Sequence, residues 1–212
     1  MQHYLVIHPT RLEAITAHNT TLTRWSLQNG TPTILTQASD EQRDICALAV
    51  APEGEYVALA SLKPAIRHDG EIVRGIVYPY SSDVDESDGD TFLPCEIEVC
   101  HWQNLAVAQT ILLPDSKASI LSMCFSPDGR WIAAADGGGC VYLVDRLNGQ
   151  IALTFTDLAG KDVSGLRFDP ASTYLTIGDL CCSWWRRGAL SAGKRRQMVM
   201  ICTWCESLST SR

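Results

Sequence analysis

Short apolar runs separated by proline- and glycine-containing turns follow one another through the first 180 residues. Four segments share the order apolar run, proline turn, apolar run: YLVIHPTRLEAI, ICALAVAPEGEYVALAS, ILSMCFSPDGRWIAAA and VSGLRFDPASTYLTI. Their turn prolines, separated by 43, 75 and 43 residues, are Pro9, Pro52, Pro127 and Pro170. A second repeated feature is a turn asparagine, which occurs at intervals of 75 and 44 residues as Asn29, Asn104 and Asn148. The chain therefore repeats a unit of 43 residues, and the second unit carries an insertion of about 32 residues.

The turn residues predict four short strands in each unit. Ser126-Pro127-Asp128-Gly129 combines a proline, an aspartate and a glycine as a hairpin turn requires. Asn29-Gly30 and Asn148-Gly149 are the preferred pair for a two-residue reversal in which both residues take positive φ. The run 140–144 is apolar throughout, as expected of a small sheet that neighbours cover on both faces.

Stacked four-stranded units of this length predict an all-β fold, a β-propeller of four-stranded antiparallel blades. The blades are expected at about 1–38, 43–114 with an insertion at 63–94, 117–158 and 162–180. This amounts to three and a half to four blades, because the pattern is lost after Gly178. The segment 181–212 is set apart as a basic tail, since it carries six Lys and Arg against one acidic residue and is rich in Cys and Trp.

The third unit resembles a blade of the WD-repeat family. Its sequence from 120 to 155 has an apolar strand ending in FSPDG, a strand of small residues, a glycine turn, a strand ending at the Trp-Asp position, and then Asn-Gly. The likeness extends more weakly over 3–178, where Trp25-Ser26, Cys100-His101 and Val144-Asp145 occupy the place of the Trp-Asp pair. The resemblance implies a non-catalytic scaffold for protein binding.

Fewer than four complete blades leave open how the ring is completed, because propellers close with about four to eight blades. Three interpretations remain at this point. The chain is a fragment or a truncated, frame-shifted and non-functional product, or a partial propeller completed by blades of another chain or copy. In the third, it is a small four-bladed ring that uses the tail.

Composition narrows the class of function. With 46% hydrophobic residues the chain can bury a core, which excludes disorder as the main state. A net charge of -7 excludes the broad basic surface of a nucleic-acid-binding protein. No apolar stretch approaches the roughly 20 residues that span a bilayer, and the chain begins without a secretory leader. Nine scattered cysteines favour reduced thiols, so a cytoplasmic protein is expected.

The insertion at 63–94 holds the candidate partner-binding residues. Five acidic residues lie there without a Lys or Arg between 76 and 115: Asp83, Asp85, Glu86, Asp88 and Asp90. They do not form a helix-loop-helix calcium site, because Asp88 stands where that loop needs glycine. Two interpretations remain, a solvated loop and an acidic arm that docks a basic partner.

The other candidate sites are weaker. Asp136-Gly137-Gly138-Gly139 lacks the lysine and helix of a phosphate loop and is interpreted as a hairpin. Trp185-Arg186-Arg187-Gly188 resembles the two-arginine lipid motif of phosphoinositide-binding propellers, so Arg186 and Arg187 are candidate lipid-binding residues. The histidines and the Cys-x-x-Cys of the tail do not form a recognisable metal site, and no cofactor motif or catalytic signature is present.

The sequence thus predicts a non-enzymatic scaffold that docks other proteins on the face carrying the acidic insertion. Two alternatives remain from other classes. One is a regulatory domain or subunit of a larger enzyme, or a phosphoinositide-binding trafficking propeller. The other is a product without function.

Overall fold

The chain folds into successive small β-sheets. The computed structural model describes residues 4–18, 21–36, 44–62, 65–66, 68–70, 72–73, 94–116, 118–156, 163, 165–178, 186–187 and 198–201. Within these residues every regular element is a strand, which confirms the all-β prediction. The strands form four four-stranded sheets and one two-stranded hairpin.

The first sheet has the strand order of the chain, β1-β2-β3-β4. Its strands are β1 (Tyr4–Ile7), β2 (Glu13–His18), β3 (Thr21–Ser26) and β4 (Pro32–Thr36). All its pairs are antiparallel, and the register places Ile7 opposite Ala14 and Ala14 opposite Trp25. Trp25 therefore lies on the same face of the sheet as Ile7.

The second sheet contains the insertion predicted at 63–94. Its strands are β5 (Asp44–Val50), β6 (Tyr56–Leu62), β9 (Cys95–His101) and β10 (Val107–Leu113). They are paired in the order β10-β9-β6-β5, so the insertion falls between the second and third strands as predicted. Within it a small hairpin forms from β7 (Ala65–Ile66) and β8 (Ile72–Val73).

The third sheet is covered by neighbouring sheets on both faces. It consists of β11 (Ile120–Phe125), β12 (Trp131–Asp136), β13 (Val141–Asp145) and β14 (Gln150–Phe155), all antiparallel. Every residue of β13 is buried, because other sheets cover both faces of the third sheet. The run without polar alternation correctly predicted this double coverage.

The fourth sheet departs from the antiparallel pattern. Its strands are β15 (Leu166–Phe168), β16 (Tyr174–Ile177), β18 (Met198–Ile201) and β17 (Arg186–Arg187), paired in that order. The β16–β18 pair is parallel, whereas antiparallel neighbours were predicted throughout. Parallel neighbours need a crossover of about a dozen residues or more, and the chain between Ile177 and Met198 is long enough to provide one. The segment 181–212 thus contributes two strands to this sheet.

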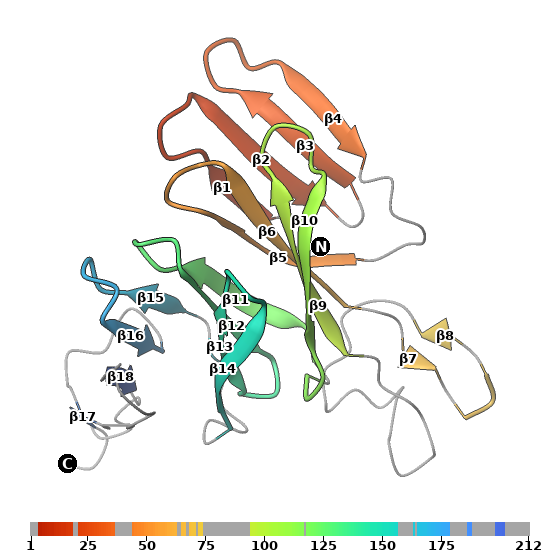
Figure 1. The fold of residues 1–212 in the computed structure, drawn as a ribbon. Coiled ribbons are helices and arrows are strands. Elements are labelled where there is room, and N and C mark those ends of the chain that lie inside the picture. The colour runs from red at the N-terminus through yellow and green to blue at the C-terminus, as the bar shows by residue number, and fades with distance from the viewer. Residues whose placement is uncertain are drawn as a thin grey trace, which may run out of the picture.

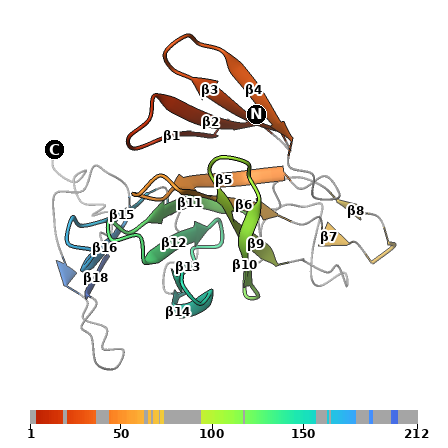
Figure 2. The same ribbon diagram turned by 45° about the horizontal axis from the view of Figure 1, so that its top comes forward.

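The sheets follow one another around a common side formed by their first strands. Strand β5 contacts both β1 and β11, and β11 contacts β15 (Figure 1). In Figure 2 the first sheet lies over the second and forms one end of the series, while the fourth sheet lies at the other. This is the arrangement of propeller blades with an open end.

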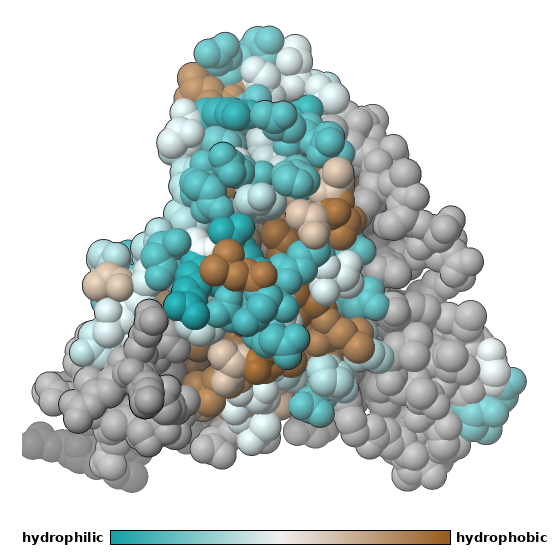
Figure 3. Space-filling model, in the orientation of Figure 1, coloured by the Kyte–Doolittle hydropathy of each residue, from teal (hydrophilic) through white to brown (hydrophobic). Residues whose placement is uncertain are grey.

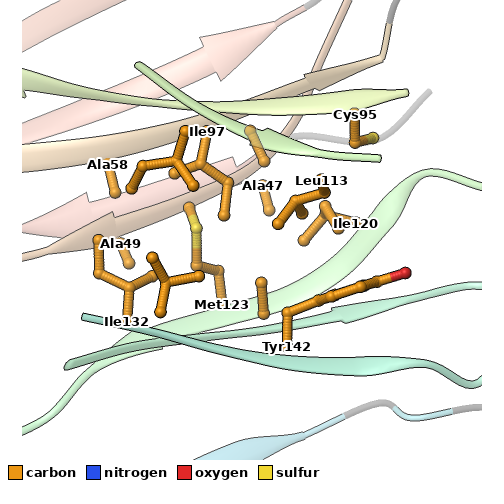
Figure 4. Close-up of a cluster of buried hydrophobic side chains, with 14 of the residues drawn as sticks. Ala47, Ala49, Ala58, Cys95, Ile97, Leu113, Ile120, Met123, Ile132 and Tyr142 are labelled. Atoms are coloured by element: carbon orange, nitrogen blue, oxygen red, sulfur yellow. The ribbon is translucent and has the colours of Figure 1, made fainter. Parts of the chain in front are cut away.

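Three buried clusters hold neighbouring sheets together. One cluster joins the first and second sheets and includes Ile15, Leu22 and Leu59. The next, shown in Figure 4, joins the second and third sheets and includes Ile97 and Met123. The last joins the third and fourth sheets through side chains such as Leu143, Phe168 and Ile177. Because each apolar cluster is shared by two sheets, no sheet buries its apolar side chains alone.

The asparagine turns differ from the predicted two-residue reversals. Gly30 and Gly149 have positive φ values of 68° and 69°, but neither preceding asparagine has positive φ. The amide of Gly149 donates to the carbonyl of Asp145, so this turn is two residues longer than the predicted two-residue reversal. The side chain of Asn148 accepts the amide of Gln150 at 2.9 Å, which stabilises this longer turn and makes a second positive-φ residue unnecessary.

Candidate interaction surface

The antiparallel register sorts the loops onto two rims. The proline turns and the asparagine turns lie together at one edge of the sheets, which we call the proline-turn rim. The opposite edge, the insertion rim, carries the insertion of the second sheet and the connections between sheets. The pairing of Leu62 with both Asp44 and Cys95 shows this arrangement, because it places the insertion beside the start of β5.

The predicted binding residues lie largely beyond the described structure. The acidic residues Asp83, Asp85, Glu86, Asp88 and Asp90 fall outside the described residues. Arg186 and Arg187 form β17 and pair with Ile201 and Met200 of β18. Of the insertion that carries the acidic residues, the described structure fixes the flanking strands β6 and β9, which end and begin at the insertion rim.

At the insertion rim the Asp136 turn connects β12 to β13, as the hairpin interpretation predicted. Its Oδ1 accepts the amides of Gly138 at 3.0 Å and Cys140 at 2.8 Å. Its Oδ2 accepts the Tyr142 hydroxyl at 3.2 Å. Burial raises the pKa of Asp136, although these hydrogen bonds oppose the shift. The chain's own carboxylate occupies the amides that a phosphate would need, so this turn is a closed structural element.

On the proline-turn rim His8 joins the first two sheets. Its Nδ1 faces two backbone donors, the amides of Thr10 at 3.1 Å and Arg11 at 2.9 Å. Because Nδ1 accepts, Nε2 carries the proton and donates to the carbonyl of Gly54 at 2.9 Å. The ring also meets Trp102 edge to face, with centroids 4.8 Å apart.

A second bond between the same sheets runs from Trp102 to Glu13. The indole Nε1 of Trp102 donates to Glu13 Oε2 at 2.8 Å, and the ring is 1% exposed. Sequence reasoning considered the histidines only as metal ligands and did not find the contact of His8 with Gly54. The only local signal is that His8, like Ser126 and Asp169, is a polar residue directly before a turn proline.

Arg146 makes the corresponding connection between the second and third sheets. Its Nε donates to the carbonyl of Gly129 at 2.6 Å, and its guanidinium lies 3.5 Å from the carboxylate of Glu53. The same guanidinium lies over the ring of Tyr56, 5.0 Å from the centroid. Between the third and fourth sheets, the amide of Asp128 donates to Ser172 Oγ at 2.9 Å. The proline-turn rim is therefore a set of fixed loops bonded from sheet to sheet.

The described residues offer little for catalysis or metal binding. Among them no group of three or more His, Cys, Asp or Glu side chains could hold a metal ion. The described cysteines are free thiols, and burial raises the pKa of both Cys100 and Cys124 to about 12. Thiols with such pKa values are poor nucleophiles at neutral pH. In the same part of the chain, no helix has the length and apolar character needed to cross a bilayer.

Comparison with known proteins agrees with this architecture. Residues 108–145 match the family WD40, described as WD domain, G-beta repeat. The match begins in β10 and ends at Asp145, so it combines the outer strand of the second sheet with three strands of the third. No curated protein matches the chain.

Among solved structures, the fold is similar to one described as the crystal structure of RRP9 WD40 repeats. The TM-score is 0.50 at 13% sequence identity, with 74% of this chain and 39% of that chain covered. The chain therefore spans about two fifths of the length of that solved chain. At this identity the likeness concerns the fold alone.

Proposed function

We propose that this WD-repeat chain, a partial β-propeller, is a non-catalytic scaffold that docks another protein on its insertion rim. WD40 repeats in general mediate protein–protein interaction, and propellers of this family are generally non-catalytic. The nine cysteines, odd in number and scattered along the chain, favour reduced thiols and so support a cytoplasmic location for this proposed scaffold.

The observation that supports the proposal is the way the insertion is mounted. It leaves β6 and returns into β9, the two central strands of the second sheet. The residues at its base, Ser61 and Cys95, are 6% and 0% exposed. A rigid base limits the conformational entropy that is lost when a partner binds to the segment it carries.

The charge of the insertion defines the class of partner. Five acidic residues within positions 83–90, with no Lys or Arg between 76 and 115, give this rim a local negative charge. A basic protein segment is the complementary partner. Complementary charge at the edge of an interface mainly raises the association rate and makes binding sensitive to salt.

The test replaces the five acidic residues with serine and measures binding to a short lysine-rich peptide by fluorescence anisotropy. The wild-type chain is expected to bind the peptide and to release it as salt rises from about 50 to 200 mM, where the screening length shortens to below about 10 Å. The serine variant is expected to lose most of this binding, with an unchanged thermal melt.

A charge-preserving variant is the matched control. Exchanging each aspartate for glutamate and Glu86 for aspartate keeps the net charge and alters only side-chain length, so peptide binding should be retained. Equal binding by the wild-type and serine variants would refute docking through the insertion. Loss of binding in the charge-preserving control would show that specific geometry, and not the local charge, governs the contact.

A further inference from the structure

The second, third and fourth sheets each present one face to the sheet before them, and equivalent positions form the corresponding face in all four units. They include the side chains four and two residues before the turn proline. We call the face that carries them the leading face and the opposite one the trailing face. The pairs of leading residues, in chain order, are Leu5 and Ile7, Leu48 and Val50, Met123 and Phe125, and Leu166 and Phe168.

In the second, third and fourth sheets the preceding sheet covers the leading face. Leu48 lies in the cluster shared with the first sheet, Met123 in the cluster shared with the second, and Phe168 in the cluster shared with the third. Each of these three side chains is 9% exposed. The repeat thus builds the leading face to be covered by another β-sheet.

The leading face of the first sheet is uncovered. Leu5 and Ile7 occupy the same positions as Leu48 and Val50 but are 60% and 57% exposed. Two more large apolar side chains, Leu12 and Leu27 in the turns that flank β2 and β3 of the first sheet, are 60% and 49% exposed. Four of the seven exposed large apolar residues of the described structure therefore belong to this one sheet and its turns. Figure 3 shows an apolar patch at the upper left, over the part of the molecule where the first sheet lies.

The remainder of this leading face carries no Lys, Arg, Asp or Glu. The register places Ala14, Thr16, His18, Thr21, Thr23 and Trp25 on it beside Leu5 and Ile7. The indole Nε1 of Trp25 donates to Thr16 Oγ1 at 2.9 Å, so its polar atom already has a partner within the sheet. A second apolar surface can cover Leu5, Ile7 and Trp25 without leaving that indole donor unpaired or burying a Lys, Arg, Asp or Glu side chain.

The fourth sheet of the chain is a poor cover for this face. On the trailing faces the position three residues before the turn proline is Val6, Ala49 and Cys124 in the first three sheets. In the fourth sheet it is Arg167, which is exposed. Packing this trailing face on the first sheet, within one chain or between copies, would bury an arginine against Leu5 and Ile7, which is unfavourable.

We propose that the leading face of the first sheet is a homodimer interface, on which the same face of a second copy of this chain packs. The face carries no Lys, Arg, Asp or Glu, so two copies related by a two-fold axis bring Leu5, Ile7 and Trp25 of one against those of the other. Isologous two-fold contacts are the commonest in soluble oligomers. Two sheets packed face to face in this way form a sandwich with interdigitating side chains. The interface does not involve the insertion rim.

Sedimentation velocity of the full chain over a range of concentrations tests the proposal. The expected result is a concentration-dependent dimer with twice the 23.3 kDa chain mass, still present at high salt. The double variant Leu5→Glu, Ile7→Glu is expected to remain monomeric, because both glutamates would be buried against their symmetry copies. Leu147→Glu is the matched control, since Leu147 is 74% exposed on the third sheet and the variant should dimerise normally.

Every outcome bears on the proposal. A wild-type chain that stays monomeric at all concentrations overturns it. A dimer that persists in the double variant also overturns it. Assembly into species larger than a dimer overturns it too if Arg167→Ala alters that assembly, because the result would indicate head-to-tail contacts. If the double variant fails to melt cooperatively, the milder Leu5→Ser variant takes its place and should weaken dimerisation at least tenfold. Persistence of the dimer at high salt separates this interface from the salt-sensitive insertion rim.

Discussion

Replacing Gly54 with alanine should separate the first sheet from the second. Gly54 has φ of +74°, and a Cβ at this position would lie 2.4 Å from Cε1 and 2.5 Å from Nε2 of the His8 ring. His8 cannot yield freely, because its Nδ1 is held by two backbone amides and its ring rests against Trp102. The added methyl group therefore strains the contact that joins the two sheets.

The magnitude has two parts. A non-glycine residue at positive φ costs about 1–2 kcal/mol, and forcing an extra methyl group into a packed contact costs about 1–3 kcal/mol. The expected loss for Gly54→Ala is thus about 3 kcal/mol of unfolding free energy. Gly30→Ala measures only the cost of the positive φ, since Gly30 has φ of +68° and a methyl group added there would meet nothing within 4 Å.

Urea unfolding followed by circular dichroism measures both variants. Gly54→Ala should unfold at a clearly lower urea concentration than Gly30→Ala, and the difference should disappear when His8 is also replaced by alanine. This double-mutant cycle isolates the His8 contact from the backbone strain. Equal losses for the two glycine variants would refute the argument that His8 joins the sheets.

Three further outcomes are expected. Burial raises the pKa of Asp136, so the native state holds this proton more firmly than the unfolded chain does. The protein should therefore lose stability as the pH rises from about 4, the pKa of an unfolded aspartate, through the raised pKa of the native state. Asp136→Asn should flatten this pH dependence of the urea midpoint. Cys100 and Cys124, whose pKa values burial raises to about 12, should resist iodoacetamide at pH of about 8 in the native protein and react after unfolding, as mass spectrometry would show. Trp102→Phe removes the donor to Glu13 and should cost about 1–3 kcal/mol, with an unchanged urea midpoint as the contradicting result.

Much of the fold could be predicted because its signals are local. A proline turn that recurs at intervals of 43, 75 and 43 residues specifies a hairpin wherever it occurs, and the run 140–144 without polar alternation specifies a strand that is covered on both faces. The resemblance to WD-repeat blades implied that Trp25, Cys100 and Val144 are equivalent, and the register agrees, since each lies opposite the corresponding residue of the second strand.

The candidate surfaces were harder to predict, because they depend on contacts between distant segments. The His8 to Gly54 hydrogen bond joins residues that are 46 positions apart, and the Trp102 to Glu13 bond joins residues that are 89 apart. The asparagine turns were predicted two residues too short, because the Asn148 side chain bonds to the backbone and stabilises a longer turn. The acidic residues at 83–90 stay a prediction from charge alone.

The sequence by itself determined the unit: its strands, its proline turns and the side chains that each sheet presents to its neighbour. These follow from backbone preferences and from the two-residue alternation of strands, which act within a few residues. Only the tertiary structure decided which of those faces is covered. Leu5 and Leu48 occupy equivalent positions in the repeat, yet one is 60% exposed and the other 9%, because burial depends on whether another sheet lies against the face.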